Sequence, residues 1–255
     1  MKYDLNKICD QIEKSGYCFI DKFWSDEVDR EIEIFYQNDL KPLINKTNVD
    51  KFGNRNFSLA DDEINNNPFN KIKKSKEFIN LCENILKINN IQLNKPLEIH
   101  NVIALQKNET NTNYEISSKL HFDAFYLTMI IPIKKTSNVL PDTGGSLILY
   151  PNLRNISRYS IINYLIKFLV QNSLARYLFS KNFFKKILKH TIVSTEKNKF
   201  LVFYGYRTLH GNKALTNQNL KVHSIFHVYN PHQNSGIDKF VFKRNKKARE
   251  RKLID

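Results

Sequence analysis

The chain has 255 residues, of which 41% are hydrophobic. This is enough for one large domain with its own core, and we expect a single domain over residues 1–255. Seven glycines and seven prolines exclude fibrous and low-complexity proteins. The three cysteines, Cys9, Cys18 and Cys82, are scattered, which argues against a disulfide framework or a zinc ribbon and favours a reducing cytoplasm.

The net charge of +15 suggests two kinds of partner, nucleic acid and an anionic membrane. The chain is rich in asparagine, isoleucine and lysine together, which is typical of an AT-rich genome, so a nucleic-acid partner is not favoured. The charged N-terminus lacks the apolar segment of a secretory signal, and no stretch reaches the roughly 18 apolar residues of a membrane span. We therefore expect a cytoplasmic protein, and peripheral contact with the inner membrane face stays open.

The first part of the chain reads as helix, strand and helix. Apolar residues at helical spacing predict a helix over residues 5–12, which Gly16 ends. A short apolar strand over residues 17–20 follows. Ser25 is a plausible N-cap for a second helix that runs to about Tyr36.

The middle of the chain is polar, then helical, then strand-rich. Residues 45–75 are rich in asparagine and predict a loop, whereas residues 76–88 return to helical spacing. After Pro96, short β-branched runs alternate with turns, without the βαβ alternation of a doubly wound fold. This pattern predicts a mainly β protein with flanking helices (α+β), built as a jelly roll or barrel. The expected strands cover residues 99–105, 126–133, 146–150, 200–204 and 221–229.

Two basic segments accompany the strands. Residues 156–190 predict a helical insertion that combines apolar and basic side chains. This insertion has three interpretations: a lid, a contact with an anionic membrane, or a helix pair packed on the barrel. The tail over residues 243–255 is basic and predicts a solvated helix or a frayed end.

A histidine and an aspartate with metal-ligand spacing occur at His121 and Asp123. Side chains two residues apart on a strand point to the same side, so both can enter a barrel interior. One imidazole and one carboxylate, completed by a distant histidine, form the facial triad of non-haem iron sites, in which three ligands occupy one face of the metal. A short motif of this kind recurs by chance, so its context decides.

The context resembles the phytanoyl-CoA dioxygenase family. The resemblance rests on the opening segment over residues 16–23, the GGSLILYP run over residues 144–151, and a strand that leads to Leu209-His210-Gly211. It covers the chain from Gly16 to about Tyr229. It implies a double-stranded β-helix that uses iron(II), 2-oxoglutarate and dioxygen.

By this resemblance, His121 and Asp123 are the proximal metal ligands and His210 is the distal one. Other candidates for the third ligand stay open. His190 lies in the basic insertion. His223 and His227 share a strand face with Lys221, so they could point inward beside the metal or belong to the core.

Lys221, eleven residues after His210, is the candidate anchor for 2-oxoglutarate. The family usually has an arginine there, and collagen prolyl hydroxylases use a lysine at the comparable place. Lysine binds a carboxylate as a point charge, without the bidentate fork of arginine. Asn212 and Thr128 are further candidate donors to the cosubstrate. An ordinary surface lysine remains the alternative for Lys221.

The resemblance also implies a reaction type. Halogenases on this scaffold replace the carboxylate ligand with a small residue, so the presence of Asp123 favours hydroxylation, with release of succinate and CO2. The substrate class stays broad: a small molecule, a lipid or a lipid-linked sugar. Arg154 and Arg207 would suit an anionic substrate, or they are solvated surface arginines. A non-catalytic binding protein and a nucleic-acid-directed oxygenase are the alternative functions.

Overall fold

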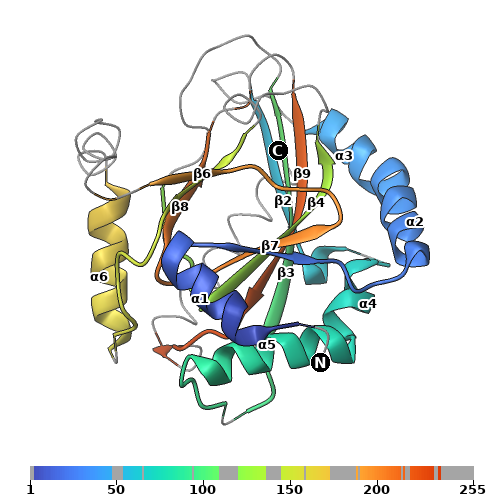
Figure 1. Ribbon diagram of the computed structural model, residues 1–255. Helices are drawn as coiled ribbons and strands as arrows, with labels where there is room; N and C mark the ends of the chain where they lie inside the picture. The colour runs from blue at the N-terminus through green and yellow to red at the C-terminus, as the bar shows by residue number, and fades with distance from the viewer. Residues whose placement is uncertain are drawn as a thin grey trace.

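Two antiparallel β-sheets face each other and form the centre of the protein (Figure 1). The larger sheet has the order β1-β7-β4-β9-β3-β2, and the smaller has the order β6-β5-β8. The strands are β1 (Cys18–Asp21), β2 (Asn54–Ala60), β3 (Ile99–Asn108), β4 (Leu127–Lys135), β5 (Leu147–Tyr150), β6 (Thr191–Val193), β7 (Lys199–Phe203), β8 (Leu209–Asn212) and β9 (Leu220–Val228). The computed structural model describes residues 3–47, 54–64, 66–93, 95–108, 120–135, 145–157, 159–172, 188, 190–213, 215, 219–232 and 235–236.

This arrangement confirms the predicted jelly roll with flanking helices. Every strand pairing between the described strands is antiparallel. The β-branched runs predicted as strands became β3, β4, β5, β7 and β9. The short strands β6 and β8 were not predicted. β6 has three residues and β8 has four, so neither is long enough to show an alternating pattern.

Helices on the N-terminal side follow the predicted order. α1 (Leu5–Ser15) ends at Gly16, whose φ of 84° is left-handed and whose N–H donates to the Ile12 carbonyl. α2 (Asp26–Phe35) starts after Ser25 and continues through a π-helical turn (Tyr36–Leu40) into α3 (Lys41–Lys46), so the helical stretch runs further than the predicted end near Tyr36.

The loop predicted over residues 45–75 is wrong in part. The segment contains β2, a 3₁₀ turn (Asp61–Glu63) and α4 (Phe69–Lys74). β2 pairs with β3 along its whole length as an edge strand. Its Asn56 and Ser58 line an internal cavity, so the strand is polar on the side that would carry apolar residues in a packed core.

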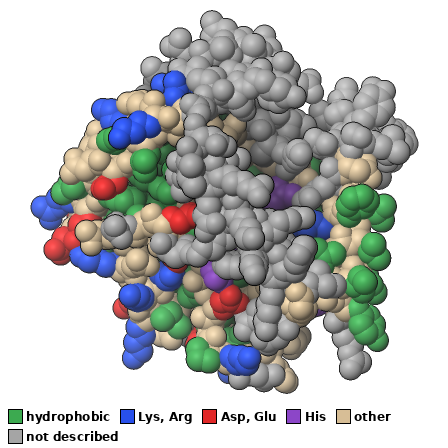
Figure 2. Space-filling view, turned by 180° about the vertical axis from the view of Figure 1, so that it is seen from behind, with side chains coloured by type: hydrophobic (Ala, Val, Ile, Leu, Met, Phe, Trp, Pro, Cys, Tyr) green, Lys and Arg blue, Asp and Glu red, His purple; other side chains and the backbone are tan. Residues whose placement is uncertain are grey.

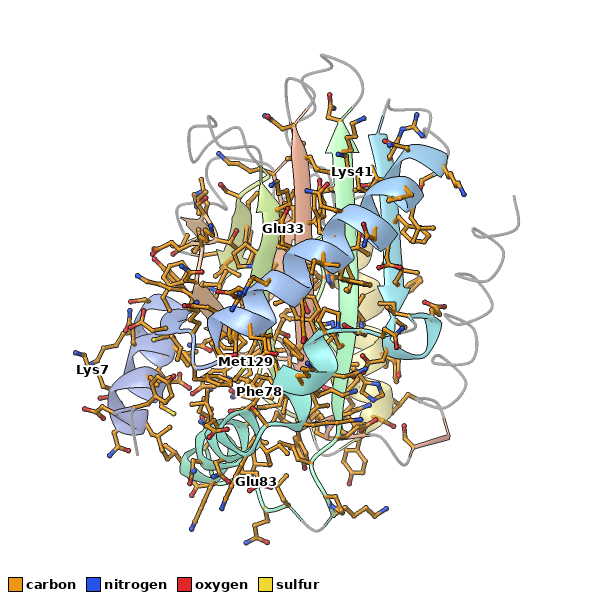
Figure 3. The ribbon with its side chains drawn as sticks, turned by 90° about the vertical axis from the view of Figure 1, so that its right-hand side faces the viewer. Lys7, Glu33, Lys41, Phe78, Glu83 and Met129 are labelled. Carbon is orange, nitrogen blue, oxygen red and sulfur yellow. The ribbon has the colours of Figure 1, made fainter. Side chains whose placement is uncertain are left out.

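The largest apolar core lies between the larger sheet and the helices α1, α2, α4 and α5. α5 (Lys76–Ile88) buries Phe78, Leu81 and Ile85, as its predicted helical spacing requires. Figure 3 shows α2 lying across the sheet and α5 at its lower end, and Phe78 of α5 and Met129 of β4 belong to the same apolar core. This packing fixes one face of the sheet and leaves the other face for the cavity.

The smaller sheet is covered on its outer side by α6 (Ser160–Gln171). Ile166 and Val170 of α6 pack against an apolar cluster that includes Phe122, Ile148 and Tyr150. α6 supplies the first part of the predicted insertion; most of the rest of it, and the predicted tail over residues 243–255, lie outside the described residues. No helix in the described part of the chain is both long and apolar enough to cross a membrane.

Candidate metal centre

The two candidate histidine ligands are fixed by main-chain pairing. His121 and His210 form an antiparallel β-bridge, in which each backbone N–H donates to the other residue's carbonyl at 2.9 Å. Their rings lie on the same side, with centroids 4.4 Å apart. The spacing argument assumed that His121 lies in a strand, whereas the residue forms only an isolated bridge. The bridge directs its side chain in the same way as a strand would.

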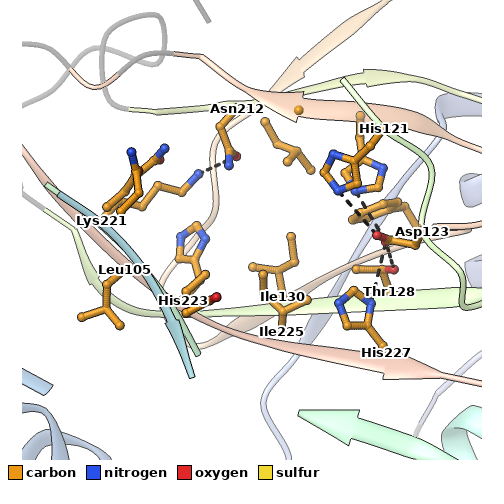
Figure 4. A pocket seen from close by; sticks show the side chains of 18 of the residues that line it. Leu105, His121, Asp123, Thr128, Ile130, Asn212, Lys221, His223, Ile225 and His227 are labelled. Carbon is orange, nitrogen blue, oxygen red and sulfur yellow. Dashed lines mark hydrogen bonds and ion pairs between the residues drawn. The ribbon is translucent and has the colours of Figure 1, made fainter. Parts of the chain in front are cut away.

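Asp123 completes a cluster of three donor groups. Its backbone N–H donates to the Gly205 carbonyl at 3.0 Å, which holds the segment beside the turn before β8. Asp123 Oδ1 lies 3.6 Å from His121 Nε2, and Oδ2 lies 3.5 Å from His210 Nε2. The three ligand atoms are all within 4.8 Å of one another, close enough to hold one metal ion (Figure 4).

Neighbouring groups orient these side chains. The Thr128 hydroxyl donates to Asp123 Oδ2 at 2.5 Å. His210 Nδ1 lies 3.0 Å from the Thr208 carbonyl, and an N–H donated there leaves Nε2 with a lone pair directed at the cluster. Gly205 leaves the space that the Thr128 and Asp123 side chains occupy. Contacts of this kind set the tautomer and direction of metal ligands in proteins.

The cluster is electrostatically coupled. Burial raises the pKa of Asp123, but the imidazoles of His210, His227 and His121 outweigh burial and hold its pKa well below the usual range. Burial lowers the pKa of His210, and the Asp123 carboxylate reverses this and raises it. The carboxylate is therefore ionised, as a metal ligand must be.

A cavity of about 370 Å³ extends from this cluster between the two sheets. One face of β9 lines it with Lys221, His223, Ile225 and His227, which alternate along the strand as a two-residue period requires. The cluster lies at one end, and Lys221 and Asn212 lie at the other (Figure 4). Volumes of this order are typical of small-molecule sites.

Lys221 is buried at the far end of the cavity. Its Nζ donates to Asn212 Oδ1 at 2.8 Å and also to the Gly145 carbonyl. The structure does not support the interpretation of Lys221 as an ordinary surface lysine, because only 6% of the residue is exposed. Of the two predicted neutral donors, Asn212 lies beside Lys221, whereas Thr128 lies at the metal end.

The three other histidines that were considered as metal ligands each contact a different residue. His227 lines the cavity with Nδ1 at 3.8 Å from Asp123 Oδ2, and its ring stacks on Phe125. His223 Nε2 lies 3.1 Å from Thr195 Oγ1. His190 packs near the Tyr150 ring and is not among the residues that line the cavity.

Arg154 binds the backbone around the cluster and is not solvated. Its guanidinium lies between the rings of Phe122 and Tyr206, at 4.2 and 4.0 Å. It donates to the carbonyls of Tyr206 at 2.6 Å, Asp123 at 3.3 Å and Asn163 at 3.4 Å. Burial lowers the pKa of Arg154 to about 10. Arg154 thus links α6 to both segments that carry the candidate ligands.

Arg207, the second candidate for an anionic substrate, pairs with Glu13 of α1 at 2.5 Å. It is not among the residues that line the 370 Å³ cavity. The roles of Gly205 and Arg154 were not found by sequence reasoning, since both depend on contacts between segments far apart in the chain.

Comparisons with known proteins agree on the fold. No family model matches the sequence, and no curated protein matches it. Among solved structures, the epimerase SnoN in complex with Fe3+, alpha ketoglutarate and nogalamycin RO has a TM-score of 0.56 at 12% identity, covering 89% of this chain and 83% of SnoN. AviO1 from Streptomyces viridochromogenes has a TM-score of 0.55 at 10% identity, covering 91% and 97%.

A third neighbour is a prolyl hydroxylase from Trichoplax adhaerens, solved with a hypoxia inducible factor peptide. It has a TM-score of 0.51 at 13% identity, and the match covers 91% of this chain and 92% of the hydroxylase. At these identities the likeness shows the fold alone, which this chain shares with SnoN, AviO1 and the prolyl hydroxylase.

Proposed function

We propose that this protein is an iron(II)- and 2-oxoglutarate-dependent dioxygenase that hydroxylates a small organic substrate. The observation that carries the proposal is the cluster of His121, Asp123 and His210 at one end of a cavity whose other end holds Lys221. A fold shared with oxygenases does not by itself give an activity. The donor set and the cavity supply the argument for chemistry.

His121, Asp123 and His210 would hold the iron. Two imidazoles and one carboxylate are the donor set of non-haem iron(II) sites that keep positions free for other ligands. The Thr208 carbonyl fixes a His210 tautomer that suits metal binding, and the room left by Gly205 lets the carboxylate approach. The cluster therefore fits the metal without rearrangement of the main chain.

Lys221 would bind the far carboxylate of 2-oxoglutarate, with Asn212 beside it. A carboxylate at this end would place an anion next to a buried ammonium, which favours binding. The contacts to Asn212 and Gly145 hold the Nζ in place beforehand. Thr128 acts through Asp123 in this proposal, because its hydroxyl already donates to that carboxylate.

Iron and 2-oxoglutarate together supply oxidation of an unactivated C–H bond by dioxygen, with release of succinate and CO2. The protein's residues would position both and would keep water away from the reacting atoms. Hydroxylation is the proposed outcome, since the carboxylate of Asp123 is present. The narrower proposal is a lipid, an acyl conjugate or a lipid-linked sugar as the substrate, and its support is the interpretation of the insertion over residues 156–190 as a contact with an anionic membrane. The complete set of three ligand groups argues against a non-catalytic role, and a nucleic-acid substrate is favoured by the net charge of +15 alone.

Anaerobic titration with iron(II) and 2-oxoglutarate tests the function. We expect a weak visible charge-transfer band and, after addition of oxygen, release of succinate. His121→Ala, Asp123→Ala and His210→Ala should each lose both signals, whereas the control His190→Ala should keep them. If His210→Ala keeps succinate release and His223→Ala loses it, the third ligand is misassigned. Absence of the band in the intact protein would refute the proposal.

A further inference from the structure

The outward face of α6 is apolar and exposed. Phe168 is 73% exposed, Leu169 61%, Leu165 57% and Ile161 56%. These residues follow helical spacing and form one strip along the helix, which Figure 2 shows as a column of hydrophobic side chains at the edge of the molecule. The opposite face of the same helix packs on the smaller sheet through Ile166 and Val170. α6 is therefore apolar on two sides, and the described residues of the protein cover only one of them.

The exposed strip carries no charge. Lys167 is the one charged residue of α6, and it lines a small cavity on the inner side together with Arg154 and Tyr206. Exposed helices of water-soluble proteins normally place charged residues outward. A contiguous apolar strip on the surface marks a contact with another molecule or with a membrane.

The charge of the sequence favours an anionic partner. Residues 143–195, the stretch of sequence that contains α6, have eight lysines and arginines and no aspartate or glutamate. The whole chain carries +15. Such a segment is attracted to an anionic surface, with about 1 kcal/mol from each basic residue near it. It repels a second copy of the same chain.

The dimensions of the strip point the same way. α6 has 12 residues, so the strip is about 18 Å long and about 10 Å wide. The outline of the strip therefore covers about 180 Å². Each partner in a stable protein interface contributes roughly 800 Å², which is a much larger area. A bilayer requires no matching surface, because an interfacial helix lies flat with its apolar face among the acyl chains.

We propose that α6 docks flat on an anionic lipid bilayer through Ile161, Leu165, Phe168 and Leu169. This surface is separate from the cavity and does not depend on the oxygenase activity. Attachment would hold the protein at the membrane with α6 between the bilayer and the smaller sheet. The contact of Arg154 with the Asn163 carbonyl ties the docked helix to the segment that carries Asp123.

Vesicle co-sedimentation of the full chain tests the proposal. The vesicles are phosphatidylcholine alone or an equal mixture of phosphatidylcholine and phosphatidylglycerol. We expect binding to the mixture at low salt, weaker binding at high salt, and little binding to phosphatidylcholine alone. Leu165→Gln and Phe168→Gln should each weaken binding roughly tenfold. Ile34→Gln is the matched control, because Ile34 is a 59% exposed apolar residue on α2 and should leave binding unchanged.

Each other outcome overturns the proposal. Failure of the intact protein to bind the mixed vesicles at low salt excludes docking. Equal loss in Ile34→Gln and Phe168→Gln shows that binding is not located on α6. A concentration-dependent dimer in light scattering that Phe168→Gln abolishes, without vesicle binding, assigns the strip to a second copy. Unchanged thermal unfolding of the variants shows that the fold is intact, as expected for exposed positions.

Discussion

Replacement of Gly205 by alanine should damage the metal site while the fold is kept. A Cβ at this position would lie 2.1 Å from Thr128 Oγ1 and 2.5 Å from Asp123 Oδ2. Both separations are far below van der Waals contact, so the threonine hydroxyl and the carboxylate must move. Gly205 is not among the glycines with positive φ, so the main chain itself accepts alanine and the effect is steric.

The size of the effect follows from what the movement breaks. The hydrogen bond from Thr128 to the Asp123 carboxylate contributes roughly 1.5–3 kcal/mol, because its acceptor is charged. Loss of an orienting contact of this kind lowers metal affinity by about 10–100-fold in other sites. We therefore expect Gly205→Ala to bind iron(II) or a substitute divalent ion at least about tenfold more weakly, with a stability loss of about 1–3 kcal/mol from overpacking.

Anaerobic calorimetric titration with metal measures the affinity, and urea unfolding measures the stability. Gly236→Ala is the matched control, since a Cβ there would meet nothing within 4 Å. Thr128→Ala is the second variant, because it removes the hydroxyl without adding an atom beside Asp123 and should lower metal affinity in the same direction. Metal affinity in Gly205→Ala equal to that of the intact protein would refute the reasoning.

Three more predictions concern the two ends of the cavity and its support. Lys221→Ala should weaken 2-oxoglutarate binding by roughly 2–5 kcal/mol and leave metal affinity nearly unchanged, and Lys221→Arg need not restore it; unchanged cosubstrate affinity in calorimetry would assign the anchor to another cation. Asp123 raises the pKa of His210 despite burial, and a protonated His210 cannot bind metal. Metal affinity should therefore be full above that raised pKa and fall as the pH drops through it; metal titrations across pH that show no such loss would contradict this. Arg154→Ala should cost at least about 3 kcal/mol in urea unfolding, since it removes a charged donor from several carbonyls, and Arg154→Lys should recover only part; a loss below about 1 kcal/mol would show that the stacked guanidinium is dispensable.

The sequence was sufficient where local patterns decide the structure. Helical spacing located α5, and Gly16 marked the end of α1 by its left-handed conformation. The β-branched runs located β4 and β9, whose buried faces lie in the main core. These elements could be predicted because each displays its own periodicity.

Other features depend on partners that no local pattern reveals. β2 looked like a loop because its cavity side is polar at Asn56 and Ser58, and only pairing with β3 makes it a strand. Arg154 was expected either to bind an anionic substrate or to be solvated, because the sequence does not show that the rings of Phe122 and Tyr206 from distant segments bury it. The order of the motifs grouped His121, Asp123 and His210 as candidate metal ligands. It could not show whether His227 lies beside the metal site or belongs to the apolar core.

The β-bridge between His121 and His210 has a consequence for how the protein handles metal. Two main-chain hydrogen bonds join His121 and His210, so the backbone sets the distance between the two residues without a metal ion. An arriving ion meets donors that are already assembled, and a departing ion leaves them in register. Metal binding would then fill a site that the folded main chain has already formed. In a zinc finger, by contrast, metal binding supplies the folding energy. The bridge also means that a different donor atom can be introduced at either position without moving its neighbour.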